Sequence, residues 1–214
     1  MMKIAIIGAG GFGREVKMLI DQINLKHKQY EFIGFFDDGI EKDSLVNGFP
    51  VLGNIDDINT INYDIAIVIA IGNPNTKKNI LNKINSKKVV FPTLIHPNVQ
   101  FDNDGVTIGK GCIICASNII TVNVTIGDFV ILNLMCTVGH DVIINDFCSF
   151  MPSVNISGEV IIEQGVYIGT GAVIINQLNI GENTIVGAGS LVVKTLPKNC
   201  TALGIPAKPI KYHE

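Results

Sequence analysis

The chain has little charge and no long apolar run, and each of these absences excludes a class of protein. Only 16% of the 214 residues are charged, the formal net charge is -3 and the sequence pI is about 5.8. No basic face for nucleic acid or for an anionic membrane surface is expected. The longest aliphatic run, 65–71, is too short to cross a bilayer. The apolar start, 1–7, leads into a glycine turn and does not read as a signal peptide, so we expect a cytoplasmic protein.

Metal-ligand patterns are also scarce. Cys112 and Cys115 form one C-x-x-C pair, but no second pair completes a zinc site, so we expect no bound metal. The five cysteines are expected to be free thiols in a reducing compartment. There are four histidines: His27, His96, His140 and His213.

What the chain has in abundance is a six-residue repeat from Val106 to Thr195. The third residue of every block is apolar, and the first is mostly small or β-branched. A period of six fits neither a continuous helix nor a continuous strand, but it fits a short strand followed by a corner. Positions one and three point to the same side of a strand, and three blocks close one triangular coil of eighteen residues. The fifteen blocks therefore predict five stacked coils of a left-handed parallel β-helix, with glycine or asparagine at position four supplying a positive φ at the corner.

The residues before the repeat alternate between apolar strand patterns and amphipathic helix patterns. This order predicts a small parallel sheet with helices on its faces. The expected elements are strands at 3–7, 30–36, 64–71 and 87–91, a helix at 12–23 and a helix that begins at Pro74.

The sequence thus predicts two domains of a mixed fold. The first, 1–92, is a small α/β Rossmann-like domain. The second, 93–214, is the β-helix, made of a stiff link at 93–105, the hexads at 106–195 and a tail at 196–214 that wraps the end of the coil and presents Lys208.

A glycine motif follows the first predicted strand. Gly8, Gly10 and Gly13 match G-x-G-x-x-G between a strand and a helix, where the backbone can approach a phosphate at the helix N-terminus. Asp37 and Asp38 end the second strand, where a carboxylate can accept from a ribose or a base. The domain is too short for a complete dinucleotide fold, which favours one nucleotide diphosphate over NAD. A tight turn without a ligand is the alternative.

His140 is the only histidine inside the hexads. It occupies position five, so it projects from a corner, and Asp141 follows it and can orient the imidazole. Gly158 lies one coil further along the same column, roughly 4.8 Å away by the strand spacing, and its N–H can stabilise an oxyanion. Thr170 and Ala188 form a second column on another corner, with room for a long, thin ligand. A solvated histidine without a catalytic role is the alternative.

Together, the hexads, His140-Asp141, the Gly-x-Pro-Ala-Lys motif at 204–208 and the N-terminal glycine motif resemble the PglD/NeuD-type sugar acetyltransferases over essentially the whole chain. This group belongs to the hexapeptide-repeat acyltransferases. The resemblance implies a homotrimer with active sites between subunits, acetyl-CoA as the acyl donor and a nucleotide-linked amino sugar as the acceptor, with direct transfer in a ternary complex.

The resemblance also implies residue roles. His140 would be the general base, Asp141 its partner, and Gly158 the donor to the thioester carbonyl. The substrate-binding residues would be Gly8, Gly10, Gly11, Gly13, Asp37, Asp38 and Asn133. The cofactor-binding residues would be Ser149, Gly158, Thr170, Ala188 and Lys208. Two positions depart from the relatives: Asp141 replaces a glutamate, and Ser149 replaces a second histidine that is often found near CoA.

Three other functions are compatible with parts of the pattern. A carbonic anhydrase-like β-helix needs three histidines around zinc, and the coils hold one. A non-enzymatic nucleotide-sugar-binding protein would not need His140 beside Gly158. O-acetylation of a sialic acid or another sugar uses the same base chemistry; we prefer an amine acceptor because the acidic pair at 37–38 suits a nucleotide carrier.

Overall fold

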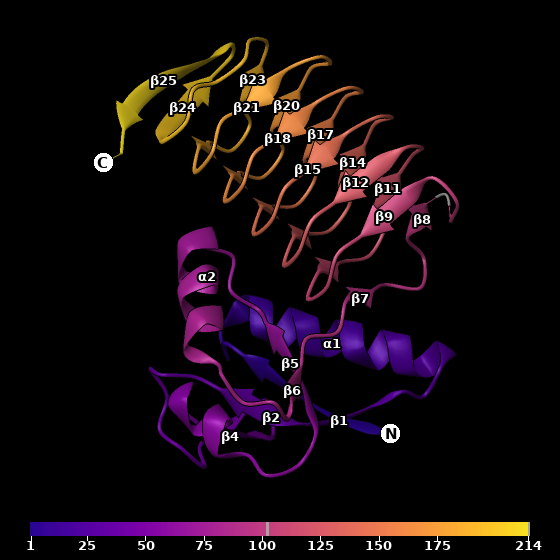
Figure 1. Cartoon of the computed structure of the whole chain (residues 1–214), viewed down its shortest axis with the longest axis vertical. Coiled ribbons are helices and arrows are strands. Elements are labelled where there is room, and N and C mark those ends of the chain that lie inside the picture. The colour runs from indigo at the N-terminus through magenta and orange to yellow at the C-terminus, as the bar shows by residue number, and fades with distance from the viewer. Residues whose placement is uncertain (102, 214) are drawn as a thin grey trace.

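The computed structural model places a small α/β domain beneath a tall coil of short strands (Figure 1). It describes residues 1–101 and 103–213. Asp102 of the predicted link and Glu214 of the predicted tail lie outside the described residues. The predicted fold class, an α/β domain followed by a left-handed parallel β-helix, is confirmed.

The N-terminal domain is a parallel sheet with one helix on each face. The strand order is β3-β4-β2-β1-β5-β6, in which β3 pairs antiparallel with β4. Alternate residues of β1 face opposite sides: Ile4 and Ile6 pack with α1, while Ala5 and Ile7 pack with α2. The elements are β1 (Met2–Ile7), α1 (Gly11–Lys26), β2 (Tyr30–Phe36), β3 (Leu45–Val46), β4 (Phe49–Gly53), η1 (Asp56–Thr60), β5 (Ile65–Ile69), α2 (Pro74–Lys83) and β6 (Val89–Val90). The elements between 45 and 60 were not predicted, because they are short and interrupted by glycine and proline.

The β-helix has three faces, which the chain visits in turn. The first face contains β7 (Leu94–Ile95), β10 (Ile113–Ile114), β13 (Ile131–Leu132), β16 (Ser149–Phe150), β19 (Tyr167–Ile168), β22 (Ile185–Val186), β24 (Cys200–Gly204) and β25 (Ala207–Tyr212). The second contains β8 (Gln100–Phe101), β11 (Ile119–Ile120), β14 (Thr137–Val138), β17 (Asn155–Ile156), β20 (Val173–Ile174) and β23 (Leu191–Val192). The third contains β9 (Val106–Ile108), β12 (Val124–Ile126), β15 (Ile143–Ile144), β18 (Ile161–Ile162) and β21 (Asn179–Ile180). We name each corner by the two faces that it joins.

Strand pairing confirms the eighteen-residue coil. Ile131 pairs with Ile113 on one side and with Ser149 on the other. Positions one and three fill the interior: Val130, Leu132 and their equivalents in neighbouring coils form one continuous buried cluster. The interior is therefore the stacked aliphatic core that the hexads predict.

The β-helix begins earlier than the hexads indicate. The prediction of an extended link at 93–105 was wrong, because β7 and β8 lie in that segment and already belong to the first and second faces. Leu94 pairs with Ile113, nineteen residues away, whereas Val106 pairs with Val124, eighteen residues away. The chain has one extra residue between Phe101 and Val106, which shifts the six-residue phase. The strands before Val106 are therefore out of phase with the hexads, and the repeat does not predict them.

The corners also differ from the prediction in their chemistry. Positive φ values, between 55° and 70°, occur at position six and not at position four. Position four needs glycine for another reason: a Cβ on Gly139 would lie 2.7 Å from the Gly158 nitrogen, and a Cβ on Gly169 would lie 2.5 Å from the Ala188 nitrogen. The left-handed residues are Gly111, Ser117, Asn123, Phe129, Met135, Asp141, Phe147, Ser153, Glu159, Gly165, Gly171, Gln177, Asn183 and Gly189.

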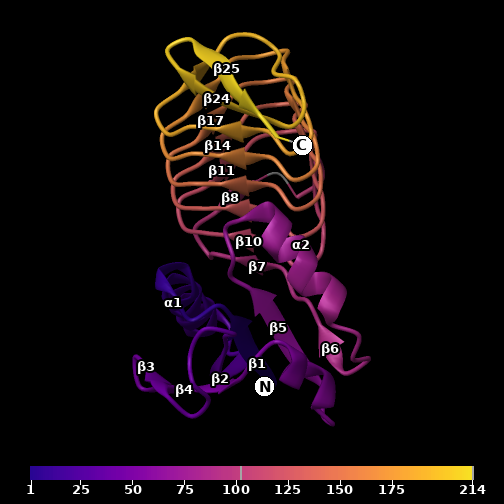
Figure 2. The same cartoon turned by 90° about the vertical axis from the view of Figure 1, so that its left-hand side faces the viewer.

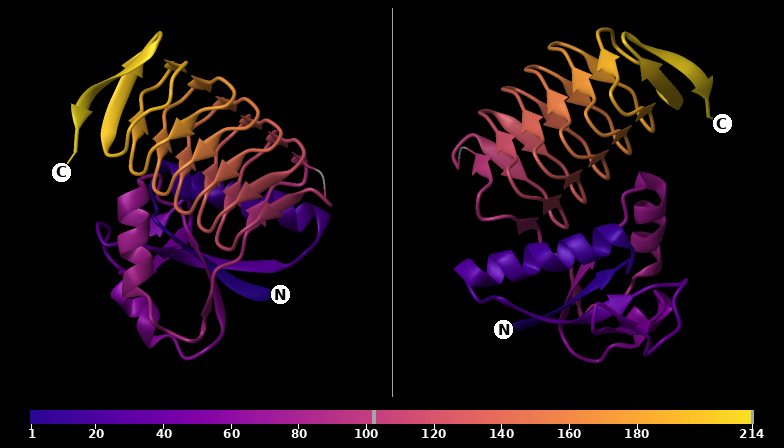
Figure 3. Two further views of the ribbon diagram at one scale, coloured as in Figure 1. Left: turned by 45° about the horizontal axis from the view of Figure 1, so that its top comes forward. Right: turned by 180° about the vertical axis from the view of Figure 1, so that it is seen from behind.

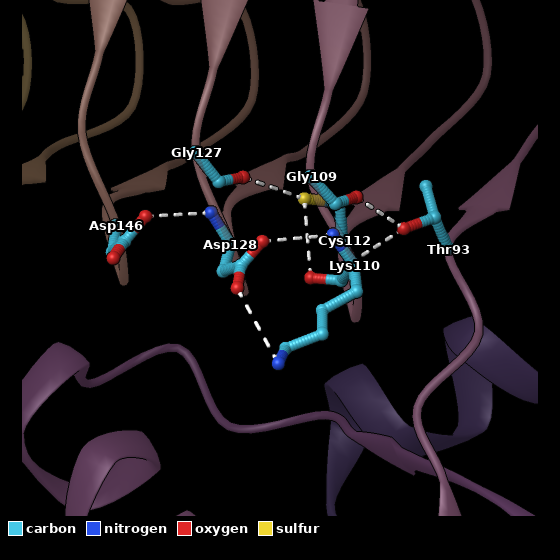
Figure 4. A network of polar contacts seen from close by, with 7 residues as sticks. All are labelled: Thr93, Gly109, Lys110, Cys112, Gly127, Asp128 and Asp146. Atoms are coloured by element: carbon cyan, nitrogen blue, oxygen red, sulfur yellow. Dashed lines mark hydrogen bonds and ion pairs between the residues drawn. The ribbon is translucent and has the colours of Figure 1, made fainter.

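At the third–first corner, aspartates at position five form hydrogen bonds to the backbone of the preceding coil (Figure 4). Asp146 Oδ1 accepts from the Asp128 N–H at 2.7 Å, and Asp128 Oδ1 accepts from the Lys110 N–H at 3.0 Å. Thr93 donates from Oγ1 to the Gly109 carbonyl at 2.6 Å where the chain enters the coil. These bonds satisfy backbone groups that strand pairing leaves unpaired at the corner.

The C-terminal tail lies at the end of the coil, and it forms a β-hairpin that the sequence did not predict (Figure 2). Strand β24 extends the first face by pairing parallel with β22, and β25 returns antiparallel beside it. The hairpin therefore closes the last coil. No helix among the described residues is long and apolar enough to span a bilayer.

The two domains pack through bulky side chains on the outer surface of the first coils, with α1 lying beneath them (Figure 3). Ile113 and Ile131 join the buried cluster of α1. Phe129 and Phe147 stack with ring centroids 5.5 Å apart and join the cluster of α2. This contact turns the carboxyl ends of the sheet strands toward the β-helix: a Cβ on Gly72, just after β5, would lie 3.7 Å from Met151 Cε.

Candidate functional site

The glycine motif forms the turn from β1 into α1, and its glycines divide into two kinds. Gly8 has φ +97°, and a Cβ on Gly13 would overlap the Gly8 carbonyl, so these two glycines make the turn possible. Gly10 and Gly11 are exposed, and a Cβ on Gly10 would meet no atom within 4 Å. Helix α1 has no side-chain N-cap bond and no acidic residue in its first turn, so its positive end is accessible to an anion.

Both acidic residues after β2 are engaged with the backbone of their own domain. Asp37 accepts from the Ala9 N–H and from the Gly39 N–H, each at 2.8 Å. Asp38 accepts from the Ile55 N–H at 2.9 Å. Asp37 therefore shapes the glycine turn, a role that the sequence did not indicate. Each carboxylate oxygen can accept more than one hydrogen bond, so both residues keep acceptor capacity for a ligand.

His140, Asp141 and Gly158 come together at the second–third corner. Asp141 Oδ2 lies 2.7 Å from His140 Nδ1, and Asp141 Oδ1 accepts from Asn123 Nδ2 at 3.0 Å. The hydrogen bond to His140, followed by that to Asn123, lowers the pKa of the Asp141 carboxyl. This arrangement leaves Nε2 as the free ring nitrogen of an imidazole that remains 57% exposed.

Gly158 lies directly against the His140 ring. A Cβ on Gly158 would overlap Nε2 and would lie 2.5 Å from Cε1, so a side chain there would displace the His140 ring from this position. Among the described residues, none accepts a hydrogen bond from the Gly158 N–H. The column geometry expected for residues 140 and 158 is thus present, and it puts a basic ring nitrogen beside a backbone donor.

Thr170 and Ala188 lie on a different corner from His140. Both are exposed at the first–second corner, in adjacent coils, and Gly189 N–H donates to the Thr170 carbonyl at 2.8 Å. Asn133 follows β13 at the same corner, but its side chain is buried and accepts from the Leu134 N–H at 2.7 Å. Within one chain, the structure therefore separates the predicted base from the predicted CoA column and from Asn133.

Ser149 is not accessible in this chain. It is fully buried beneath α2, where its hydroxyl accepts from Lys77 Nζ at 3.1 Å. The cofactor contact predicted for it finds no support in this geometry. Lys208 is exposed on β25, at the far end of the coil.

Lys77 is a buried residue that the sequence analysis missed. Its side chain is 1% exposed, and the amine donates to Ser149 Oγ and, at 3.4 Å, to the Cys148 carbonyl. Burial lowers the pKa of Lys77 from 10.5 to about 7. It lies in an ordinary amphipathic helix, so only the packing of α2 against the coil distinguishes it from the exposed Lys78.

The cysteines are unsuited to nucleophilic chemistry. Burial raises the pKa of Cys112 and of Cys136 to about 11, and that of Cys115 and of Cys148 to about 12. At neutral pH these thiols are protonated and therefore unreactive. Among the described residues, no group of three or more His, Cys, Asp or Glu side chains is arranged to hold a metal ion.

A pocket of about 640 Å³ lies between the start of α2 and the upper part of the first face. None of the residues predicted from the sequence to bind substrate or cofactor lines it. Its walls include Asn73, Asn75, Tyr167, Asn183, Asn199 and His213. The sequence carried no signal for this pocket, since its residues come from both domains and from the C-terminal hairpin.

Comparison with known proteins finds relatives for both parts of the chain. Residues 3–84 match the family model described as the PglD N-terminal domain. The chain is 33% identical, over 213 residues, to GDP-perosamine N-acetyltransferase from Escherichia coli O157:H7, covering 96% of this chain and 95% of that protein.

Solved structures match over nearly the whole length. The acetyltransferase domain of PglB from Neisseria gonorrhoeae FA1090, in complex with acetyl coenzyme A, is 32% identical with a TM-score of 0.86, covering 97% of this chain and 98% of that one. PerB from Caulobacter crescentus, in complex with CoA and GDP-perosamine, is 28% identical with a TM-score of 0.84, covering 99% and 98%.

Proposed function

Because the chain belongs to the PglD-type sugar acetyltransferases of the hexapeptide-repeat superfamily, we propose that it transfers the acetyl group of acetyl-CoA to the amine of a nucleotide-linked amino sugar. The observation that carries this proposal is the His140–Asp141 pair lying against the bare backbone of Gly158. The names of the relatives support the substrate class, since one acts on GDP-perosamine and another binds acetyl coenzyme A.

In the proposed reaction, His140 acts as the general base. The sugar amine attacks the thioester carbonyl, and Nε2 takes the proton that the amine loses. Asp141 holds the other ring nitrogen and stabilises the imidazolium that results. The Gly158 N–H donates to the oxyanion of the tetrahedral intermediate. The C–S bond then breaks, and the CoA sulfur leaves as a thiol after receiving the proton from His140.

The nucleotide end of the substrate is proposed to bind the N-terminal domain. The exposed turn at Gly10 and Gly11 lets phosphate oxygens approach the free N–H groups of α1. Gly8 and Gly13 would contribute by shaping that turn, while Asp38 is the more exposed of the two carboxylates. The short domain supports one nucleotide diphosphate as the ligand.

The separation of His140 from Thr170 and Ala188 supports an oligomer. A complete site needs the second–third corner of one chain to face the first–second corner of a neighbour. A closed ring in which every chain uses both corners satisfies this requirement, and we propose a homotrimer, the ring size that the family resemblance implies.

Replacing the proposed base tests the reaction. We expect His140→Ala to lower turnover by at least ~10²-fold, the usual size of a general-base effect, while the protein stays folded. The assay is coenzyme A release with GDP-, UDP- and dTDP-linked amino sugars, with sialic acids included as hydroxyl acceptors. His27→Ala, which alters an exposed histidine at the end of α1, is the matched control and should keep full activity. Wild-type turnover by folded His140→Ala would remove His140 from the mechanism.

A further inference from the structure

Within one chain, the pocket above α2 is separate from the corner that holds His140. It is built at the third–first corner, from Gly165 and Asn183, and on the first face, from Tyr167 and Ile185. The start of α2 closes one side and the C-terminal His213 closes another. Its volume of about 640 Å³ lies within the range of small-ligand sites, roughly 300–1,000 Å³.

The lining of this pocket combines apolar surface with polar side chains that carry no fixed charge. The described residues that line it include four asparagines, one tyrosine and one histidine, and none of these described residues is a lysine, arginine, aspartate or glutamate. A phosphate, sulfate or carboxylate ligand would be desolvated there without a cationic side chain to neutralise it. The composition therefore favours a neutral ligand rich in hydrogen-bonding groups.

Several polar atoms of the pocket keep unused bonding capacity. Asn73 uses its Oδ1 to accept from the Thr76 N–H, and Asn183 uses its Nδ2 to donate to Asn199 Oδ1. Within the described residues, Asn73 Nδ2, Asn199 Nδ2, Asn183 Oδ1 and the Tyr167 hydroxyl have no protein partner. This set contains both donors and acceptors, and a sugar hydroxyl can satisfy either kind.

An apolar floor completes the site. Tyr167 and Ile185 are neighbours in paired strands of the first face, and the side chain of Ile185 is exposed to the pocket. A sugar ring can place its face of C–H groups on this apolar floor, while the hydroxyls at its edge form hydrogen bonds with the asparagine amides.

From these contacts we propose that the pocket binds a neutral pyranose sugar, which stacks on Tyr167 and forms hydrogen bonds from its hydroxyls to the asparagine amides. This site is additional to the acetyl-transfer site and does not require His140.

Direct binding tests the proposal without using acetyl transfer. Saturation-transfer NMR and calorimetric titration would be run on the full chain with methyl glucopyranoside, methyl mannopyranoside and N-acetylglucosamine, and with inorganic phosphate and glucose 6-phosphate as charged probes. We expect saturable binding of at least one neutral sugar and none of the phosphates.

Matched variants locate the binding. Tyr167→Leu keeps an apolar side chain in the strand but removes the ring and the hydroxyl, and it should weaken binding by about tenfold. Asn75→Ala, at an exposed helical position, should weaken it by a smaller factor. Tyr212→Leu, on exposed β25 outside the pocket, should leave it unchanged.

Three results would overturn the proposal: no binding of any neutral sugar, equal binding of the charged probes, or wild-type binding by both pocket variants. Because none of these measurements depends on coenzyme A release, they leave the proposed acetyl transfer to be decided by the His140 experiment.

Discussion

Lys77 illustrates how one residue gains its character entirely from its surroundings. It is a lysine in a polar helix, yet its amine is buried against β16 with a hydroxyl and a carbonyl as partners. Among the ion pairs of the described residues, none includes it. Burying an ammonium without a carboxylate is unfavourable, which is the cause of its lowered pKa.

This lowered pKa predicts a specific dependence of stability on pH. Between about pH 7 and pH 10.5 the unfolded chain binds the Lys77 proton and the native chain does not, so the Lys77 contribution to the free energy of unfolding rises with pH. Below about pH 7 the cost of the buried charge is fully present. Lys77→Met removes this cost, so its stability relative to wild type should be highest near pH 6.5 and fall toward about pH 9.

Urea unfolding at several pH values checks this prediction, with the exposed neighbour variant Lys78→Met as the control. The control should follow the wild-type pH dependence throughout. If Lys77→Met also follows it, the amine titrates as it does in water and the buried environment assigned to it is incorrect.

The other site residues fall into two groups: those whose contacts follow from the local sequence pattern, and those whose contacts depend on distant segments packing together. The His140–Asp141 contact joins adjacent residues, and Gly158 follows from the eighteen-residue coil, so the sequence predicted all three. Ser149 could not be read in the same way, because its partner Lys77 is 72 positions away and meets it only when the domains dock. The bond from Ala9 to Asp37 likewise depends on β1 and β2 being neighbours.

At the scale of the element, the coil is set by two different positions in each hexad. Position six adopts the left-handed conformation, and position four lies too close to the next coil for a side chain at several corners. Because glycine is frequent at position four, the sequence pattern predicted the positive φ there as well. Since serine, aspartate, asparagine and even phenylalanine occupy position six, residue type alone does not reveal the left-handed corner.

A pair of glycine substitutions separates the two requirements. Gly139→Ala should lower the free energy of unfolding by about 2–3 kcal/mol, because its Cβ would meet the next coil. Gly171→Asn places a residue that tolerates positive φ in open space, and it should change stability by less than about 0.5 kcal/mol. Chemical denaturation of both variants measures the difference. Equal effects would mean that crowding between coils does not determine the choice of glycine at position four.

At the scale of the whole molecule, the proposed site combines two domains and two corners of the β-helix. The hexads predicted the coils, and the alternating strand and helix patterns predicted the α/β domain, because both kinds of pattern are local and periodic. The docking surface was not predicted. It relies on aromatic residues at position six, Phe129 and Phe147, which break the polar pattern expected of an exposed corner.

The proposed sharing of sites between chains can be measured by mixing defective subunits. Chains with His140→Ala lack the base, and chains with Thr170→Trp should block the CoA column, so each should be inactive alone. When the two are co-expressed in equal amounts and assemble at random, about a quarter of the sites pair an intact corner from each parent, and activity should return to about that fraction.

Coenzyme A release by the purified mixed oligomer provides the readout, and the two single variants mixed only after folding serve as the control. Activity that stays at the level of the single variants would argue that each site is formed within one chain. Full activity of Thr170→Trp alone would remove that column from the site.

The terminal hairpin has a consequence for how the protein behaves in a crowded cell. A stack of parallel strands ends in a row of unsatisfied N–H and C=O groups, which can recruit strands from other molecules and grow without limit. On the first face, β24 covers that row, and β25 presents an outer edge that carries Pro209 between Lys208 and Lys211. Proline cannot donate to an incoming strand, and the two lysines would repel the same lysines of another molecule, so this edge of the first face resists fibre formation.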